Sequence, residues 1–211
     1  MLIFKSAFTG QAAIGGFIGA AVRDAMRRGI TRGLMSNEAG LGSAAIVYGA
    51  ARAKHPVRQG TIAMGEVFID TIVVSTITAL VIIVSGQWSS GLDSTALTVS
   101  AFNTAIPFGG AIVALCSTLF GFTTLVGWCY YGEQCLEYLF GLKITTPYRM
   151  VYIGLTFIGC ILQRENLIIV WNVGDIINAF IVVPNLIGLL LLSGVVARMT
   201  KEYFKKDKAL L

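Results

Sequence analysis

Five long apolar stretches limit the folds open to this chain of 211 residues. They cover residues 2–22, 61–84, 109–131, 147–163 and 167–196. A bilayer core about 30 Å thick needs roughly 20 apolar residues in a helix, whereas outer-membrane strands alternate apolar and polar residues over about ten positions. The sequence therefore predicts an all-α membrane protein with five transmembrane helices in a single domain, residues 1–211. The mean hydropathy of +0.77 agrees with this prediction.

The basic residues between these stretches predict an orientation. Segment 23–60 carries seven Lys and Arg residues, whereas segment 85–108 carries none. Basic loops favour the cytoplasmic side, so we expect the N-terminus outside, segment 23–60 in the cytoplasm and segment 85–108 outside. The tail, residues 197–211, is basic and is expected in the cytoplasm. Residues 92–106 have enough apolar positions for a short helix over the outer face.

The last stretch, residues 167–196, allows two interpretations. Its 30 residues would give a helix of about 45 Å, which is long for one span and short for two spans with a turn. We expect one long helix kinked at Pro184, because two spans would place the basic tail outside. Two shorter spans remain the alternative.

Several function classes lack their signature in this sequence. The net charge of +5 lies in loops, where membrane topology explains it better than nucleic-acid binding does. The four cysteines lack metal-ligand spacing, and neither a GxxxxGK[ST] motif nor an HExxH motif occurs. A GxGxxA match at residues 40–45 follows a predicted span instead of a strand. We therefore expect neither an organic cofactor nor an enzyme.

Polar side chains inside the apolar stretches point to function, because they are costly at bilayer depth unless they are paired or face water. In the third stretch, Ser117, Gly121, Thr124 and Trp128 share one helix face, and Thr123 lies beside it. Asp70 and Asp175 lie within the second and fifth stretches. The two aspartates are candidates for coupling or gating, and the alternative is a structural hydrogen bond between helices.

The first stretch contains glycines at mid-bilayer positions. Thr9 and Gln11 precede the pair Gly15-Gly16, where each glycine lowers helix propensity by about 1 kcal/mol relative to alanine. We expect a broken helix here, because unwound backbone that lines a cavity exposes carbonyls to a cation in secondary transporters. A continuous helix packed through Gly15 and Gly19 is the alternative.

Five motifs, in order along nearly the whole chain, give a resemblance to a known family. They are RGLMSNEAGLGSA (32–44), KHPVRQG (54–60), FIDT (68–71), GWCYYGEQCLEYLFG (127–141) and PNLIGLLLLSG (184–194). The chain resembles the C-terminal half of the sodium:alanine (alanine or glycine:cation) symporter family. The resemblance implies a leucine-transporter-type fold of five plus five helices, of which these five spans would be the second inverted repeat. Sodium-coupled uptake of small neutral amino acids would then need the missing N-terminal half as partner, in the cell membrane.

The resemblance also implies site residues. The unwound site would contain Thr9, Gly10, Gln11, Gly15 and Gly16. Thr123 and Thr124 would help to bind sodium, and Thr124, Leu125 and Trp128 would line the substrate pocket. Sodium prefers several oxygen ligands, which hydroxyls and freed carbonyls can supply. The alternative function is a non-transporting membrane subunit or scaffold, or a channel.

The motif at residues 32–44 is interpreted as a gate or hinge near the inner face and not as a ligand cradle. Asn37 and Glu38 would form polar contacts that close the inner path, and Gly40 and Gly42 would permit a bend. Ser43 is expected to cap a short following helix. A fixed turn that only positions the second span is the alternative.

Overall fold

The computed structural model describes the backbone of residues 10–162 and 164–208, with side chains for residues 19–162 and 169–205. Within these residues every regular element is helical and no strand occurs. The described part of the chain thus confirms the all-α prediction.

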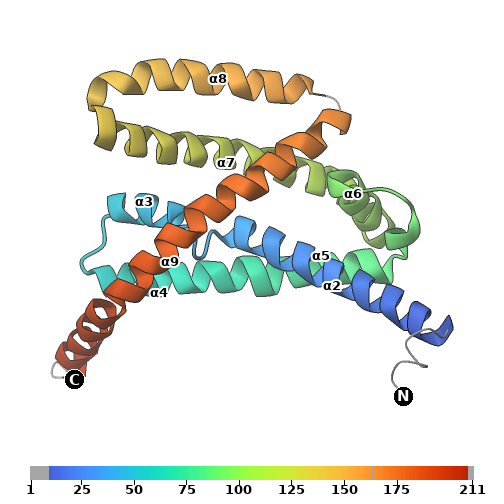
Figure 1. Cartoon of the computed structure of the whole chain (residues 1–211), viewed down its shortest axis with the longest axis horizontal. Helices are drawn as coiled ribbons and strands as arrows, with labels where there is room; N and C mark the ends of the chain where they lie inside the picture. Colours follow the sequence, from blue (N-terminus) through green and yellow to red (C-terminus); the bar gives the residue numbers. More distant parts are fainter. Residues whose placement is uncertain (1–9, 163, 209–211) are drawn as a thin grey trace.

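In the residues that the structure describes, eight α-helices and one π-helical segment follow one another along the chain. The elements are α2 (Gly10–Asn37), α3 (Ser43–Ala50), α4 (Pro56–Phe68), the π-helix η1 (Ile69–Val74), α5 (Ser75–Val84), α6 (Ser94–Ala105), α7 (Gly109–Phe140), α8 (Thr145–Ile161) and α9 (Arg164–Lys208). The short 3₁₀ turns η2 (Gln87–Ser89) and η3 (Leu142–Ile144) complete the described elements. Helix α4, η1 and α5 continue one another without a break and form a single rod (Figure 1).

Four helices of the described chain are long and apolar enough to cross a membrane. They are Pro56–Val84, Gly109–Phe140, Leu142–Ile161 and Ile169–Lys205. These four candidate spans overlap four of the five predicted apolar stretches. The remaining stretch, residues 2–22, lies partly outside the described residues, and its described part belongs to α2.

Helix α2 corrects one prediction from the sequence. Its backbone is continuous α-helix from Gly10 to Asn37, so the expected break at Gly15-Gly16 is wrong. A penalty of about 1 kcal/mol per glycine weakens a helix but does not end it while each residue keeps its helical hydrogen bonds. The described chain first leaves helical geometry at residues 38–42, between α2 and α3. This non-helical segment is called the interruption below.

The helices lie in an open arrangement. Helices α7 and α8 run side by side, α2 lies near the rod formed by α4 and α5, and α9 crosses from the end of α8 toward α4 (Figure 1). Helix α6 packs on the start of α7 and confirms the short helix expected at residues 92–106. There the Asn103 Oδ1 accepts a hydrogen bond from the Gly110 N–H at 2.7 Å.

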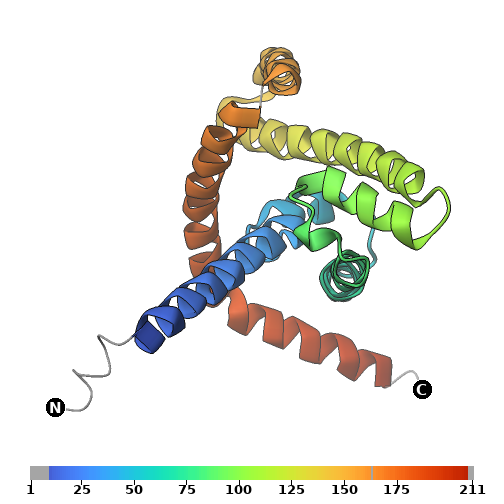
Figure 2. The same cartoon turned by 90° about the vertical axis from the view of Figure 1, so that its right-hand side faces the viewer.

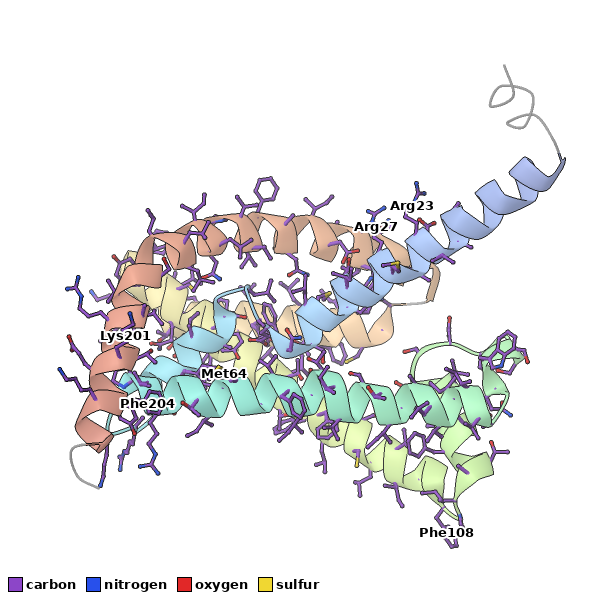
Figure 3. The ribbon with its side chains drawn as sticks, turned by 90° about the horizontal axis from the view of Figure 1, so that it is seen from below. Arg23, Arg27, Met64, Phe108, Lys201 and Phe204 are labelled. Atoms are coloured by element: carbon purple, nitrogen blue, oxygen red, sulfur yellow. The ribbon has the colours of Figure 1, made fainter. Side chains whose placement is uncertain are left out.

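Most apolar side chains of the described residues are exposed. Among residues 19–162 and 169–205, whose side chains are described, the buried core residues are Leu41 at 3% exposure and Ala101 at 0%. Figure 3 shows side chains standing away from the helices on many sides, with Phe108 at the tip before α7. Apolar helix faces of this kind fit a lipid or protein environment and not water.

Helix α9 changes direction along its length. Figure 2 shows its first part crossing the height of the molecule and its last part turning away, and Figure 3 places Lys201 and Phe204 on that last part. Pro184 lies inside this helix, and its ring cannot donate the N–H that the Phe180 carbonyl would accept. The kink at Pro184 itself stays a prediction.

Candidate functional site

The interruption has a backbone that glycine permits and most other residues avoid. Glu38, Gly40 and Gly42 all have positive φ angles of 52°, 95° and 84°. The side chain of Leu41 is buried, and the Leu41 N–H donates to the Glu38 carbonyl at 3.1 Å. A non-glycine residue with positive φ is uncommon, so the conformation of Glu38 depends on the contacts of its neighbours.

The C-terminal end of α2 is bonded to the π-helical segment of the α4–α5 rod. The Ser36 hydroxyl donates to Asp70 Oδ2 at 2.8 Å, and the Asn37 amide donates to the Thr71 hydroxyl at 2.9 Å. Within η1, the Ser75 N–H bonds to the Asp70 carbonyl, five residues earlier. Such π-helical turns are frequent at functional sites. The structure therefore brings together two predicted site residues, Asn37 and Asp70.

These contacts place the interruption beside the middle of two candidate spans. Asp70 lies fourteen residues after the start of Pro56–Val84 and fourteen before its end. On α9, Asn185 donates from its amide to the Gly40 carbonyl at 2.7 Å, and it lies within two residues of the midpoint of Ile169–Lys205. The interruption is therefore at the level of both span centres.

Glu38 connects the interruption to two further helices. Its Oε2 accepts a hydrogen bond from the Ser43 hydroxyl at 2.7 Å, and its carboxylate interacts with the Tyr131 hydroxyl of α7. The predicted cap is wrong, because Gly42 occupies the N-cap position of α3 and has no side chain for capping. The Ser43 hydroxyl instead donates a hydrogen bond to Glu38. The short helix α3 itself is present as expected.

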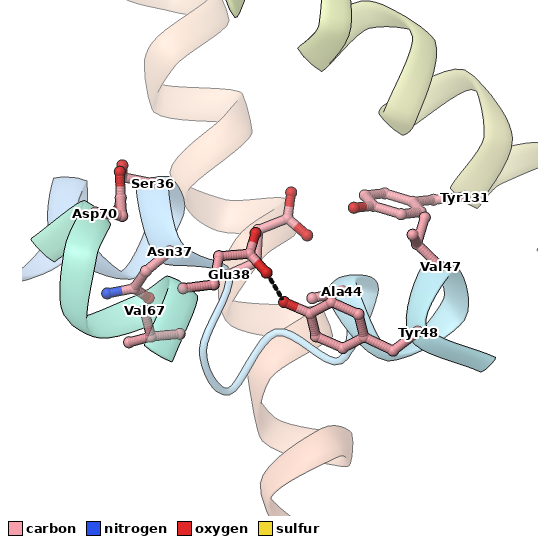
Figure 4. A pocket seen from close by; sticks show the side chains of 10 residues that line it. Ser36, Asn37, Glu38, Ala44, Val47, Tyr48, Val67, Asp70 and Tyr131 are labelled. Carbon is pink, nitrogen blue, oxygen red and sulfur yellow. Dashed lines mark hydrogen bonds between the residues drawn. The ribbon is translucent and has the colours of Figure 1, made fainter. Parts of the chain in front are cut away.

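A cavity of about 200 Å³ opens between these elements (Figure 4). Ten residues line it: Ser36, Asn37, Glu38, Ala44, Val47, Tyr48, Glu66, Val67, Asp70 and Tyr131. The hydroxyl of Tyr48 donates to Glu66, which crosses the cavity from α3 to α4. At about 30 Å³ per water, the cavity has room for a small polar solute or several waters.

The predicted pocket residues all lie on α7. Thr124 lies fifteen residues after the start of Gly109–Phe140 and sixteen before its end, so Thr123, Thr124 and Leu125 occupy the middle of that span. The Thr123 hydroxyl donates to the Phe120 carbonyl at 3.0 Å, as hydroxyls in helices often do. Trp128 is half-buried and meets Tyr131 edge to face at 5.7 Å between ring centroids.

Tyr131 lines the cavity but was not predicted from the sequence. It continues the series of Thr124 and Trp128 by three positions on the same helix face. Through its ring it contacts Trp128, and through its hydroxyl it interacts with Glu38. The helix face that contains Thr124 and Trp128 continues to position 131, so extending the same periodicity would have predicted Tyr131.

Asp175 lies in a separate part of the molecule. It accepts a hydrogen bond from Arg32 of α2 at 3.3 Å, and the Arg32 guanidinium lies 4.3 Å from the ring centroid of Trp171. A cavity of about 670 Å³ between α2 and α9 is lined by these residues and further polar side chains. Asp175 therefore joins α2 to α9, apart from the cavity beside the interruption.

The structure does not bring the glycine-rich residues of the first stretch to this site. Gly10, Gln11, Gly15 and Gly16 belong to the start of α2, and Thr9 lies outside the described residues. Twenty-one residues of continuous helix separate Gly16 from Asn37, which is about 32 Å. The same helix therefore holds these positions far from the interruption.

Metal-binding side chains do not cluster in the described part of the chain. No group of three or more His, Cys, Asp and Glu side chains there could hold a metal ion. The four cysteines are free thiols. Hydroxyl and carbonyl oxygens, the kind of ligand that a hard monovalent cation accepts, are available on α7 and in the interruption.

Comparisons with known proteins give consistent matches over nearly the whole chain. A family model described as the sodium:alanine symporter family matches residues 1–210. The chain is 44% identical to the sodium/alanine symporter AgcS of Methanococcus maripaludis, 36% identical to the probable sodium/glutamine symporter GlnT of Bacillus subtilis and 33% identical to the sodium/proton-dependent alanine carrier protein of Bacillus sp. (strain PS3).

These alignments cover 98–99% of the chain and 46%, 43% and 49% of the three relatives. The chain thus spans about half the length of the curated relatives that it matches. The comparisons give no support for the expected missing N-terminal half, because the relatives align with nearly the whole of this chain over less than half of their own length. No solved structure gives a significant match to the chain.

Proposed function

Because the chain belongs to the sodium:alanine symporter family, we propose that it forms part of a sodium-coupled symporter for small neutral amino acids such as alanine or glycine. The four candidate spans are those of a multi-pass membrane protein of this transporter family. The exposed apolar faces of its helices and the length of its relatives support a partnership with further helices, which would complete a five-plus-five fold. Alternating access would then occur around a site shared by both sets.

The proposed topology contains five membrane-crossing elements. Helix α2, the interruption and α3 would form one broken element, followed by the α4–α5 rod, α7, α8 and α9. This topology differs from the expectation that the whole of segment 23–60 is cytoplasmic. Helix α2 would enter the membrane from the outer side and reach the centre of the bilayer at Asn37. Arg52, Lys54 and Arg58 would still be cytoplasmic, α6 outside and the C-terminus inside.

One observation supports the proposed site: hydrogen bonds join the interruption and the adjoining end of α2 to the middle of two candidate spans, and Thr124 lies in the middle of a third. Unwound backbone at this depth exposes carbonyls and N–H groups that can bind a cation and the charged ends of an amino acid. The Thr123 and Thr124 hydroxyls would add oxygen ligands for sodium. Trp128 and Leu125 would limit the size of the substrate side chain.

A chimera tests the function. This chain would replace the matching region of the Methanococcus maripaludis symporter, and uptake of labelled alanine would be measured in liposomes. We expect uptake that depends on an inward sodium gradient, and exchange of labelled for unlabelled alanine without a gradient. A correctly inserted chimera that shows neither would contradict the proposal, and a channel or scaffold would show no such exchange. The chain alone is expected to be inactive.

Thr123→Val in the chimera is expected to raise the sodium concentration for half-maximal uptake by about 3–10-fold, because the loss of one oxygen ligand weakens sodium binding by about 1 kcal/mol. The control is Thr118→Val on the same helix, where the hydroxyl donates to the Ala114 carbonyl one turn earlier. The measurement is the initial uptake rate as a function of sodium concentration. An unaltered sodium dependence of Thr123→Val would remove this residue from the cation site.

A further inference from the structure

Asn185 of α9 makes a long-range hydrogen bond to the interruption. Its amide donates to the Gly40 carbonyl at 2.7 Å, across 145 positions of the sequence. Gly40 and Gly42 both adopt the left-handed backbone conformation, which frees the carbonyl between them from helical bonding. The side chain of Asn185 thus supplies the partner that the helix no longer provides.

The same side chain packs directly against Gly42. A Cβ atom at Gly42 would lie 2.6 Å from Asn185 Oδ1 and 2.9 Å from Asn185 Cγ. A Cβ atom at Gly40, in contrast, would meet only Leu186 Cδ2 at 4.0 Å. Gly42 is therefore required both for its φ angle and for the space that Asn185 occupies, whereas Gly40 is required for its φ angle.

Asn185 directly follows Pro184, the proline inside α9. Pro184 leaves the Phe180 carbonyl without its helical donor, which weakens the helix at that turn. Ten residues earlier, about 15 Å along the axis, Asp175 pairs with Arg32 of α2. Helix α9 therefore holds α2 before Pro184 and the interruption after Pro184.

We propose that Asn185 is a positioning residue through which α9 holds the Gly40 carbonyl and the Gly42 backbone in the conformation of the interruption. A displacement of α9 would move the Asn185 amide and with it the Gly40 carbonyl relative to the end of α2. The consequence for transport rests on the proposed function, whereas the contact itself is measurable without any transport.

A double-mutant cycle tests the contact on the full chain in detergent micelles. Gly42→Ala is expected to lower the Tm by roughly 5–10 °C, through backbone strain and the clash with Asn185. Adding Asn185→Ala removes the clash. The Tm of the double variant should therefore fall by clearly less than the sum of the decreases in the two single variants. The control pair is Gly33→Ala with Asn185→Ala, because a Cβ atom at Gly33 meets nothing within 4 Å, and the effects of these two substitutions on the Tm should be additive. Additive losses in the Gly42 pair would overturn the proposal.

Thiol labelling gives a second measurement if Gly42→Ala does not fold. A background with the four native cysteines replaced by alanine would carry Ala39→Cys, and its reaction rate with N-ethylmaleimide would be recorded. Asn185→Asp should raise this rate several-fold, because a carboxylate cannot donate to the Gly40 carbonyl and repels it. Asn185→Gln, which keeps the donor, should restore part of the slow reaction, and Asn178→Asp on the same helix should leave the rate unchanged.

The outcomes separate the two proposals. The positioning role would be overturned if the chain with native Asn185 and the variants Asn185→Asp and Asn178→Asp were all labelled at the same rate. This result would hold whatever the chimera transports. If the cycle shows coupling and Asn185→Asp accelerates labelling, the positioning role holds. Absent alanine uptake by the unsubstituted chimera would then count against the proposed function alone.

Discussion

Alanine uptake by the chimera is expected to fall to the background of empty liposomes when Thr124→Ala and Trp128→Leu are combined. Thr124 lies at the centre of the α7 span, one helical turn before Trp128, and the two side chains share a face. The first change removes an oxygen ligand at the proposed sodium site. The second removes the aromatic wall and its edge-to-face contact with Tyr131. Initial rates of labelled alanine uptake measure the loss.

The matched control for this pair is Thr118→Ala with Trp88→Leu. Thr118 is an exposed threonine on the same helix, and Trp88 lies in η2 with 68% of its surface exposed. The control should keep most of the uptake, since neither side chain lines the proposed site. Normal uptake by the Thr124 and Trp128 double variant would show that the α7 face is structural only.

Glu38→Gln is expected to lower alanine uptake by about 10–100-fold. The carboxylate of Glu38 accepts from Ser43 at 2.7 Å and interacts with the Tyr131 hydroxyl, so it ties the interruption to α3 and α7. Hydrogen bonds to a charged group contribute about 1.5–3 kcal/mol, and an amide cannot replace the charge. The positive φ of Glu38 makes the residue dependent on these contacts. Uptake rates and the amount of inserted chimera would be measured together.

Glu137→Gln provides the comparison for Glu38. Glu137 lies on α7, and its side chain accepts only a long hydrogen bond from Gln134 at 3.5 Å in the described structure. The rate of alanine uptake by the Glu137→Gln variant should remain within about twofold of the rate of the unsubstituted chimera, because a hydrogen bond of this length contributes little. Equal activity of the two variants would mean that the charge of Glu38 is not needed, either for a gate or for a site.

The membrane helices could be predicted from the sequence because each needs a run of about 20 apolar residues. Four candidate spans of the structure overlap the stretches at residues 61–84, 109–131, 147–163 and 167–196. The short helix α6 followed from the apolar positions of residues 92–106. These features depend on local composition and periodicity, which one sequence contains in full.

The location of the helix break could not be predicted in the same way. The glycines at positions 15 and 16 have weak helix propensity, yet α2 runs through them. The break occurs at residues 38–42, where Ser43 bonds Glu38 and the distant Asn185 bonds Gly40. Asp70 and Thr71 bond the adjoining end of α2. Intrinsic propensity is a weak preference that such tertiary contacts override. The position of the motif at residues 32–44 among the helices depends on contacts across up to 145 positions.

Part of the site followed from helix periodicity and part did not. Thr124 and Trp128 were found as one face of α7, and Tyr131 belongs to the next step of that series. Asn37 and Asp70 were both named, although only the structure shows that the end of α2 meets the π-helix at Asp70 and Thr71. A π-helical turn leaves no distinct sequence pattern, so this meeting point was not predictable.

Thiol labelling of Ala39→Cys in the chimera tests most directly whether the interruption belongs to the transport site. All native cysteines would be replaced, and Ser90→Cys, in the loop after α5, would serve as the control position. We expect sodium and alanine together to slow labelling at position 39 several-fold, because the bound solutes would occupy or close the cavity beside Glu38. Labelling at position 90 should not respond. If Ala39→Cys is labelled at the same rate with and without sodium and alanine, the placement of the site at the interruption is contradicted.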